Sequence, residues 1–307
     1  MARRRRNNGR NVNGILLLDK PVGITSNAAL QRVKRLFNAN KAGHTGNLDP
    51  MASGLLPVCL GEATKVSGFL LDSDKHYTGT CKLGERTDSG DADGVVVQTR
   101  PVEKYSEARI LEVFSQFKGE ISQIPPMHSA IKVDGQPLYK LAHQGIEIER
   151  KPRRVNIFSL ELLRQVRDEL DIDVHCSKGT YIRTLVQDIG EKLGCGAHLN
   201  ALRRTGAGPF AIDNSCTLAE LEELAEEEGF TAMDARLLPM EYALADWPQV
   251  KLTQDSTHYL RQGQAVQVPK APTRGWVCLF ADDDRFLGVG QILGDGRVAP
   301  RRLINLA

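Results

Sequence analysis

The chain has 307 residues, of which 41% are hydrophobic and 25% are charged, a composition typical of a globular protein with one large domain and a smaller one. No apolar run reaches the roughly 18 to 20 residues of a membrane helix, and the basic start MARRRRNNGR lacks the apolar segment of a secretory signal, so we expect a cytoplasmic protein. The formal net charge is only +2, and five of the first ten residues are Arg, so charge alone does not indicate a nucleic-acid-binding body.

Residues 1–10 are predicted to form a basic, disordered arm. Without these five arginines the net charge of +2 becomes −3, so the body of the chain is close to neutral. Such an arm attracts phosphates weakly and without sequence preference, and salt suppresses the attraction.

The first regular elements follow the arm. Residues 14–19 form a short apolar run that reads as a buried strand ending at Lys-Pro-Val-Gly. Thr25 or Ser26 can cap the next helix, whose buried face carries apolar residues at helical spacing, and a second helix repeats that spacing. The apolar residues of these two helices are Leu30, Val33 and Phe37 in the first, and Ala63, Val66 and Leu70 in the second.

Residues 76–85 and 94–100 are predicted to be two strands joined across the turn-rich segment 88–94. The segment resembles a calcium-binding loop, because counting from Ser89 puts Gly94 at position six. Position twelve is Arg100, where such a loop needs a Glu, so we interpret 88–94 as the tip of a hairpin.

A third helix is predicted around 110–117, and Gly119 ends it. The next stretch, 121–152, differs from the rest because it is irregular and mixes basic with aromatic groups, a combination that can hold phosphates and stack bases. An ordinary solvent-exposed loop without a binding role explains the same residues equally well. The groups in question are Lys132, Tyr139, Lys140, His143, Arg150 and Lys151.

The second half of the chain alternates strands and helices before its character changes. Strands are expected at 154–163 and 170–176, then a helix with its buried residues between 182 and 193, closed by Gly194. Thr217-Leu-Ala-Glu220 is a capping box that opens a Glu-rich helix, which we expect to face away from any RNA. From Trp247 onward, short strands predict a small β-domain. The fold class is therefore α+β, with a mixed or antiparallel sheet, flanking helices and a compact β-barrel-like module.

The most unusual segment is Gly43–Pro57, where three Gly and two Pro predict an elaborate loop rather than a helix or strand. Enzymes place reactive groups on such loops, and Asp49 lies here beside Pro50 and near His44. Two other readings stay open: Asp49 can simply shape a turn, and His44 can be a structural histidine. A nucleotide-binding loop is not supported, since neither glycine-rich phosphate motif accompanies His44.

Several segments together resemble the TruB family, bacterial tRNA pseudouridine synthases that act on the uridine at position 55 of the T arm. The central one is GHTGNLDPMASGLLPVCLGEATK around Asp49. The others occur in the family order and span nearly the whole chain: GILLLDKPVGITSN, YTGTCKLGERTDSGDADG, IPPMHSA, CSKGTYIRTLVQDIGEKLGCGAHLNALRR and RVAPRRL. One local departure is Asn47, where many members carry a small residue, and we expect it to leave activity intact.

The resemblance implies a role for each matching residue. Asp49 would be the catalytic nucleophile, Arg183 would pair with it, and Tyr77 would stack on the target base and assist proton transfer. Three further residues would hold the everted nucleotide and the T loop: His44, Tyr181 and Leu202. Lys20 would be structural or supportive.

The resemblance also implies the domain organisation and the partners. A pseudouridine synthase catalytic domain would span 11–246, with an RNA-gripping insertion at about 121–152, and a PUA-type RNA-binding β-barrel would span 247–307. The expected partner is the T arm of tRNA, with no membrane and no protein partner, and the expected state is a monomer. The family uses no metal or organic cofactor. In agreement, the six cysteines are scattered without a C-x-x-C pair, which indicates neither a zinc site nor a disulfide framework.

Pseudouridine formation breaks the N1–C1′ bond, turns the uracil and joins C5 to C1′, so no atoms enter or leave. A carboxylate can attack C1′, as in retaining glycosidases, or remove the C2′ proton to give a glycal, and the sequence leaves both routes open. Two other functions are compatible with parts of the sequence: a non-catalytic protein that binds or folds tRNA, and a nucleoside hydrolase that releases uracil.

Overall fold

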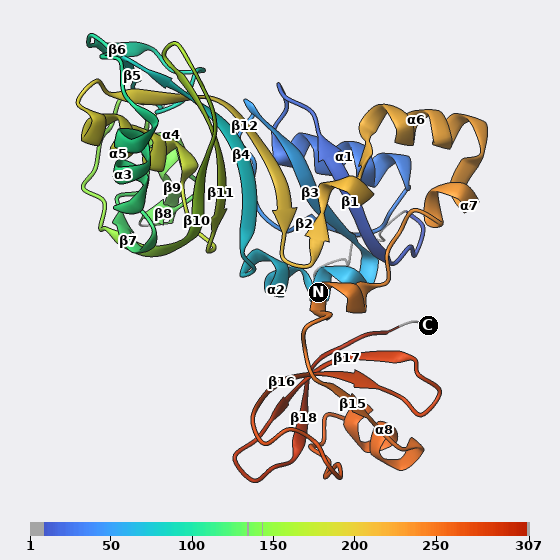
Figure 1. The fold of residues 1–307 in the computed structure, drawn as a ribbon. Helices are drawn as coiled ribbons and strands as arrows, with labels where there is room; N and C mark the ends of the chain where they lie inside the picture. The colour runs from blue at the N-terminus through green and yellow to red at the C-terminus, as the bar shows by residue number, and fades with distance from the viewer. Residues whose placement is uncertain (1–8, 134, 143, 306–307) are drawn as a thin grey trace.

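The computed structural model describes residues 9–133, 135–142 and 144–305, so most of the predicted arm, residues 1–8, lies outside the described residues, as does His143 of the insertion. Its centre is a ten-stranded sheet with the order β14-β1-β3-β12-β4-β11-β10-β7, to which β2 adds beside β3 and β13 beside β12 (Figure 1). The pairs β1–β14 and β3–β12 are parallel and the others are antiparallel, so the predicted mixed sheet is confirmed. The strands of this sheet are β1 (Gly14–Lys20), β2 (Ala42–His44), β3 (Ala52–Leu60), β4 (Lys75–Leu83), β7 (Gly119–Gln123), β10 (Arg153–Val166), β11 (Glu169–Cys176), β12 (Ala197–Ala207), β13 (Phe210–Ala211) and β14 (Cys216–Thr217).

Helices cover the two halves of this sheet. One core joins α3 and α5 to β4, β10, β11 and β12, and another joins α1, α6 and α7 to β1 and β3 (Figure 1). No described helix is long and apolar enough to cross a membrane. The helical elements are α1 (Ser26–Leu36), η1 (Gly61–Lys65), α2 (Ser67–Leu71), α3 (Glu107–Ser115), α4 (Leu138–Ala142), α5 (Ile182–Leu193), η2 (Ile212–Asn214), α6 (Leu218–Glu227), α7 (Gly229–Asp234), η3 (Met240–Leu244) and α8 (Gln254–Arg261).

The predicted helix boundaries are confirmed where a side chain or a glycine fixes them. The Thr25 hydroxyl accepts a hydrogen bond from the amide of Ala28 at the start of α1. Thr217 and Glu220 form the predicted capping box of α6, and Gly194 ends α5 with a left-handed φ of 96°. Each of these caps satisfies backbone groups that a helix end otherwise leaves unpaired.

Three expectations about secondary structure are wrong in detail. The helix expected around residues 63–70 is two short pieces, η1 and α2, because the amide of Val66 bonds to Ala63 and so tightens the turn. Strand β4 is not part of the 76–100 hairpin, which β5 (Glu85–Thr87) and β6 (Val96–Thr99) form instead; Gly84, with a φ of 88°, turns the chain between β4 and β5. The loop expected over 43–57 shrinks to residues 45–51, since β2 and β3 take the flanks.

One central strand and much of the insertion went unpredicted. Strand β12 pairs with β4 on one side and with β3 on the other, yet its sequence alternates poorly between polar and apolar residues. Strand β7, at the edge of the main sheet, overlaps the start of the predicted insertion. The rest of the insertion contains α4 and a small hairpin of β8 (Lys132–Val133) and β9 (Gln136–Pro137).

The C-terminal module is a small sheet domain with its own core. Its four strands run in the order β15 (Gln249–Lys251), β16 (Gly275–Phe280), β17 (Phe286–Ile292) and β18 (Val298–Leu303), with α8 packed against them (Figure 1). A second apolar cluster is shared with the larger N-terminal domain, where the ring centroid of Phe69 lies 4.8 and 5.4 Å from those of Trp247 and Trp276. The Lys65 ammonium also donates to the Leu303 carbonyl at 2.7 Å, so the module is fastened to η1 and α2.

Strand β3 can approach β12 only because residue 54 is a glycine. Gly54 pairs with Arg204 and has a φ of +104°, and a Cβ atom there would lie 2.3 Å from the carbonyl oxygen of Arg204. Both the steric overlap and the left-handed backbone exclude other side chains at this position.

We therefore expect Gly54→Ala to lower the free energy of unfolding by about 2 kcal/mol or more, because β3 and β12 must separate. Gly68→Ala is the matched control: a Cβ atom added to Gly68 in α2 would have nothing within 4 Å, so alanine should be neutral or slightly stabilising. Denaturant unfolding of both variants measures the difference. Equal stabilities would show that the β3–β12 approach does not depend on glycine.

Candidate active site

The Asp49 loop, residues 45–51, is held in one conformation by the start of α1. The buried hydroxyl of Ser26 accepts from the amide of Leu48 at 2.7 Å and donates to its carbonyl at 3.0 Å. The amide of Thr45 donates to the Pro57 carbonyl at 3.1 Å, which closes the loop across β3. Asp49 therefore extends from a rigid support rather than from a mobile segment.

The carboxylate of Asp49 meets a buried arginine at the start of α5. Arg183 is 4% exposed, and its Nη2 lies 3.0 Å from Oδ2 of Asp49. Its Nη1 lies 3.3 Å from Oδ2 of Asp91, and the guanidinium also donates to the carbonyls of Ser89 and His128 at 3.1 and 2.7 Å. The structure thus brings Arg183 to Asp49, as the resemblance implies, and adds a second carboxylate that was not expected.

The pKa of Asp49 is raised above its ordinary value. Burial is the main cause, the nearby Arg183 and Lys20 cations oppose it, and the Asp91 carboxylate adds to it. Lys20 is fully buried, and its ammonium donates to the carbonyls of Pro21 and Ile24 at 2.7 and 2.8 Å. Burial lowers the pKa of Lys20 to about 8, although the Asp49 carboxylate opposes this by favouring the charged form of the lysine. Lys20 therefore supports the loop and supplies a positive charge near Asp49.

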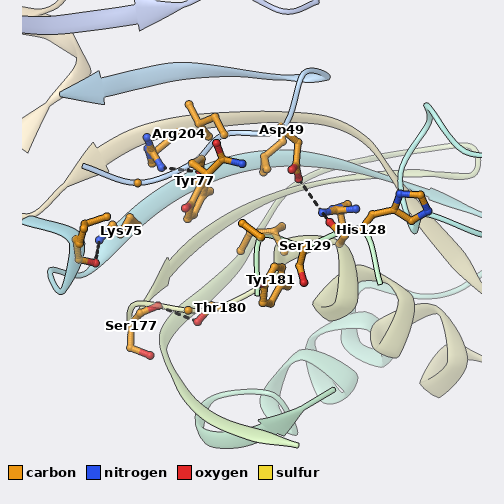
Figure 2. Close-up of a pocket in the computed structure, with 18 residues that line it drawn as sticks. Asp49, Lys75, Tyr77, His128, Ser129, Ser177, Thr180, Tyr181 and Arg204 are labelled. Carbon is orange, nitrogen blue, oxygen red and sulfur yellow. Dashed lines mark hydrogen bonds and ion pairs between the residues drawn. The ribbon is translucent and has the colours of Figure 1, made fainter. Parts of the chain in front are cut away.

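A pocket of about 230 Å³ opens in front of Asp49. Figure 2 shows Asp49 and Lys75 at opposite ends, with the rings of Tyr77 and Tyr181 between them. Leu202 also lines the pocket. Two facing aromatic side chains, an apolar side chain and a terminal carboxylate suit a flat, polar-edged group such as a nucleobase.

Tyr77 lies on β4 and its hydroxyl has a raised pKa. Burial is the largest cause, and the guanidinium of Arg204 opposes it. A phenol whose pKa is raised stays protonated at neutral pH, so in the free protein its aromatic face is better suited to stacking than its oxygen is to accepting a proton.

His44 is the one predicted site residue that the structure does not bring to the pocket wall. It ends β2, half-buried, and it is absent from the residues that line the pocket. Its pKa is lowered, first by burial and then by the Arg204 cation, so the imidazole is neutral at physiological pH. By contrast, the insertion does reach the pocket, through residues 128–130.

Three polar residues of the site were missed from the sequence: Asp91, Lys75 and Arg204. Lys75 is buried at the far end of the pocket, where its ammonium donates to the carbonyls of Leu70 and Leu71 at 3.1 and 2.9 Å, and burial lowers its pKa to about 8. Arg204 lies directly opposite Tyr77 in the β4–β12 register. For Lys75 a signal was available, because residues two apart in a strand share a face and Lys75 stands two places before Tyr77. For Arg204 the same signal was missing, since β12 was not predicted as a strand.

Metal-binding clusters are not found in the described part of the chain, where no group of three or more His, Cys, Asp or Glu could hold an ion. All six cysteines are free thiols, and five of them are buried. The ionisable side chains that line the pocket are one carboxylate, two guanidinium groups, one ammonium group, two phenols and one imidazole: Asp49, Arg183, Arg204, Lys75, Tyr77, Tyr181 and His128.

Three family models match the chain in succession. Residues 34–182 match "TruB family pseudouridylate synthase (N terminal domain)", residues 183–245 match "tRNA pseudouridylate synthase B C-terminal domain", and residues 248–304 match "Pseudouridine synthase II TruB, C-terminal". Two similar proteins are both called tRNA pseudouridine synthase B. That of Nitrosococcus oceani is 57% identical over 99% of this chain and 98% of its own, and that of Coxiella burnetii is 54% identical over 96% of each.

Two solved structures are similar in three dimensions. A Cbf5-Nop10-Gar1 complex contains a chain that matches with a TM-score of 0.72 and 29% identity, over 91% of this chain and 78% of that one. An H/ACA RNP bound to a substrate RNA containing 2′-deoxyuridine matches with a TM-score of 0.73 and 27% identity, over 94% and 84%.

Removing the charged partners of Asp49 one at a time should move its pKa in opposite directions. Arg183→Met removes the cation that favours the carboxylate, so the pKa of Asp49 should rise further, whereas Asp91→Asn removes a like charge and should lower it. The carboxylate protonates as the pH falls through this pKa, so the midpoint moves to higher pH in the first variant and to lower pH in the second. The carboxyl carbon shift of Asp49 in an NMR titration reports both, and movement in one common direction would contradict this electrostatic account.

Proposed function

The chain belongs to the TruB family of pseudouridylate synthases, and from that premise we propose that it converts the uridine at position 55 in the T arm of tRNA to pseudouridine. The observation that carries the proposal is the Asp49–Arg183 ion pair at the end of a pocket walled by two tyrosines. A protein that only binds RNA has no need of a buried carboxylate, which RNA phosphates would repel.

The proposed reaction starts when Asp49 acts on the sugar. Its carboxylate either bonds to C1′ or removes the C2′ proton, and in both routes it must be ionised. Burial works against ionisation, and the Arg183 guanidinium offsets part of that effect. Arg183 therefore serves to hold Asp49 charged and aimed at the sugar.

The remaining predicted residues would hold the base. Stacking on Tyr77 would keep the detached uracil in the pocket while it turns, with Leu202 beside Tyr77 on the same face of the sheet and Tyr181 also lining the pocket. A uridine inside a folded T arm must leave its stack to reach this pocket. His44, beside the pocket rather than in its wall, suits contact with the neighbouring RNA.

The C-terminal module, residues 247–307 as predicted, is the proposed RNA-binding domain of PUA type. It is supported by a hollow where the module meets η1 and α2, which collects cations able to hold phosphates: Lys65, Arg301 and Arg302. The 121–152 insertion would grip the T arm, since it already reaches the pocket. A cytoplasmic monomer without a protein partner, metal or organic cofactor stays our prediction.

The first test incubates wild-type protein and Asp49→Asn with unmodified tRNA or a T-arm hairpin, without added metal. We expect pseudouridine at one T-loop uridine with wild type, and a loss of several orders of magnitude with Asp49→Asn, because the amide can neither attack nor take a proton. Base-specific chemical mapping measures the product. Free uracil instead would indicate a nucleoside hydrolase, and tight tRNA binding without conversion by wild type would indicate an RNA-binding or RNA-folding protein.

A second test separates stacking from proton transfer at Tyr77. Tyr77→Phe keeps the ring and Tyr77→Leu does not, so we expect the Phe variant to retain at least about tenfold more single-turnover activity, in line with about 1–3 kcal/mol for stacking one base. Equal losses in both variants would assign the essential role to the hydroxyl group. Tyr105→Phe, a tyrosine outside the pocket, serves as the control and should behave as wild type.

A further inference from the structure

Arg204 is a buried cation in the pocket wall, and one of its three guanidinium nitrogens makes no well-formed hydrogen bond in the described part of the chain. The side chain is 1% exposed, its Nε donates to the Leu55 carbonyl at 2.7 Å, and its Nη1 donates to the Asn47 carbonyl at 3.4 Å. These two bonds tie the Asp49 loop, at Asn47, to β3, at Leu55. The remaining nitrogen, Nη2, is buried and makes no well-formed hydrogen bond among the described residues, although the Tyr77 hydroxyl lies close enough to interact with the guanidinium.

The positive charge of Arg204 also lacks a counter-ion within the described ranges. Arg183 is balanced by two carboxylates, Asp49 and Asp91, whereas no described acidic side chain forms an ion pair with Arg204. A buried guanidinium without a counter-ion is costly, and proteins keep such groups where a partner arrives from outside. Its field reaches across the site, since Arg204 lowers the pKa of His44 and opposes the rise in the pKa of Tyr77.

The register of the sheet brings this cation to the place where the base would lie. Tyr77 and Arg204 are directly paired across β4 and β12, so their side chains leave the same face of the sheet, and Leu202 shares that face two residues away. Figure 2 shows Arg204 and Tyr77 side by side, with Asp49 farther along the pocket. A uracil stacked on Tyr77 would have the sugar and Asp49 on one side and Arg204 near its edge.

Breaking the glycosidic bond creates a charge that a cation at this place can stabilise. The N1–C1′ electron pair stays on the uracil, either as an Asp49 oxygen bonds to C1′ or as Asp49 takes the C2′ proton and a C1′–C2′ double bond forms. In both routes the detached base is an anion, spread over N1 and its two carbonyl oxygens, until C5 bonds to C1′. That step releases the Asp49 carboxylate from C1′ in the first route, or Asp49 returns its proton to C2′ in the second, after which C5 loses its proton and N1 gains one. Fixed donors in a dry site stabilise such transient charge strongly.

We propose that Arg204 is a catalytic residue whose Nη2 donates a hydrogen bond to a carbonyl oxygen of the uracil and whose charge stabilises the base as it leaves C1′. The proposal rests on the proposed function and adds to it: Arg183 serves the carboxylate that acts on the sugar, and Arg204 serves the leaving group.

The test compares two leaving groups in the same RNA. Arg204→Met should slow single-turnover cleavage of the N1–C1′ bond by about 100-fold or more with uridine at the target position, the usual cost of losing one such donor. With 5-fluorouridine there, the electron-withdrawing fluorine already stabilises the departing anion, so the same variant should be at least about tenfold less impaired. Digestion and chromatography of the target nucleoside measure loss of the N-glycoside in both RNAs, although fluorine blocks the final loss of the C5 proton.

Two further variants keep the test decisive. Arg203→Met removes the neighbouring, half-exposed arginine of β12, which pairs with Asp19, and should stay within about threefold of wild type on both RNAs. Arg204→Lys keeps the charge but cannot make three directed contacts at once, so it should fall between wild type and Arg204→Met, and it carries the comparison if the Met variant does not fold. A loss by the same factor on both RNAs would reduce Arg204 to a support of the loop and overturn the proposal. Failure of wild type to cleave uridine would instead overturn the proposed function.

Discussion

The ion pair between Asp49 and Arg183 is the interaction around which the catalytic domain is arranged. Burial that excludes water from the pocket also penalises the charge on Asp49, and only a fixed cation can offset that penalty. Arg183 is itself buried and must be fully satisfied, which draws in the carboxylate of Asp91 and two carbonyl groups. Four segments far apart in the chain therefore converge on one guanidinium: the Asp49 loop, the hairpin tip, the insertion and the start of α5.

The sheet supplies the second constraint, because it sets where each remaining group can stand. Strand β12 lies between β3, which follows the Asp49 loop directly, and β4, which carries Tyr77. Gly54 permits the close approach of β3 to β12, and the register between β12 and β4 places Arg204 opposite Tyr77. The Asp49 loop, the Tyr77 ring and the buried Arg204 cation are thus fixed relative to one another by backbone hydrogen bonds of the sheet.

The C-terminal module is joined to this framework through an apolar cluster that both domains share, rather than through a flexible linker. Phe69 of α2 packs against Trp247 and Trp276, and carbonyl groups at the end of the same short helix accept hydrogen bonds from the Lys75 ammonium. The helix that bounds the far end of the pocket is therefore also the helix on which the module rests.

The sequence by itself determined the local features whose causes are local. Glycines and prolines around Asp49 predicted an irregular segment, and hydroxyl caps and Gly194 set helix ends that the structure confirms. Motif resemblance named the family, and the comparisons agree. What only the tertiary structure decided was which groups meet. Lys75 and Arg204 line the pocket, Asp91 pairs with Arg183, His44 stands outside the pocket wall, and β4 leaves its expected hairpin for the centre of the sheet. The physical reason is that a buried charge is stabilised by partners distant in sequence, and neither periodicity nor turn chemistry records such partners.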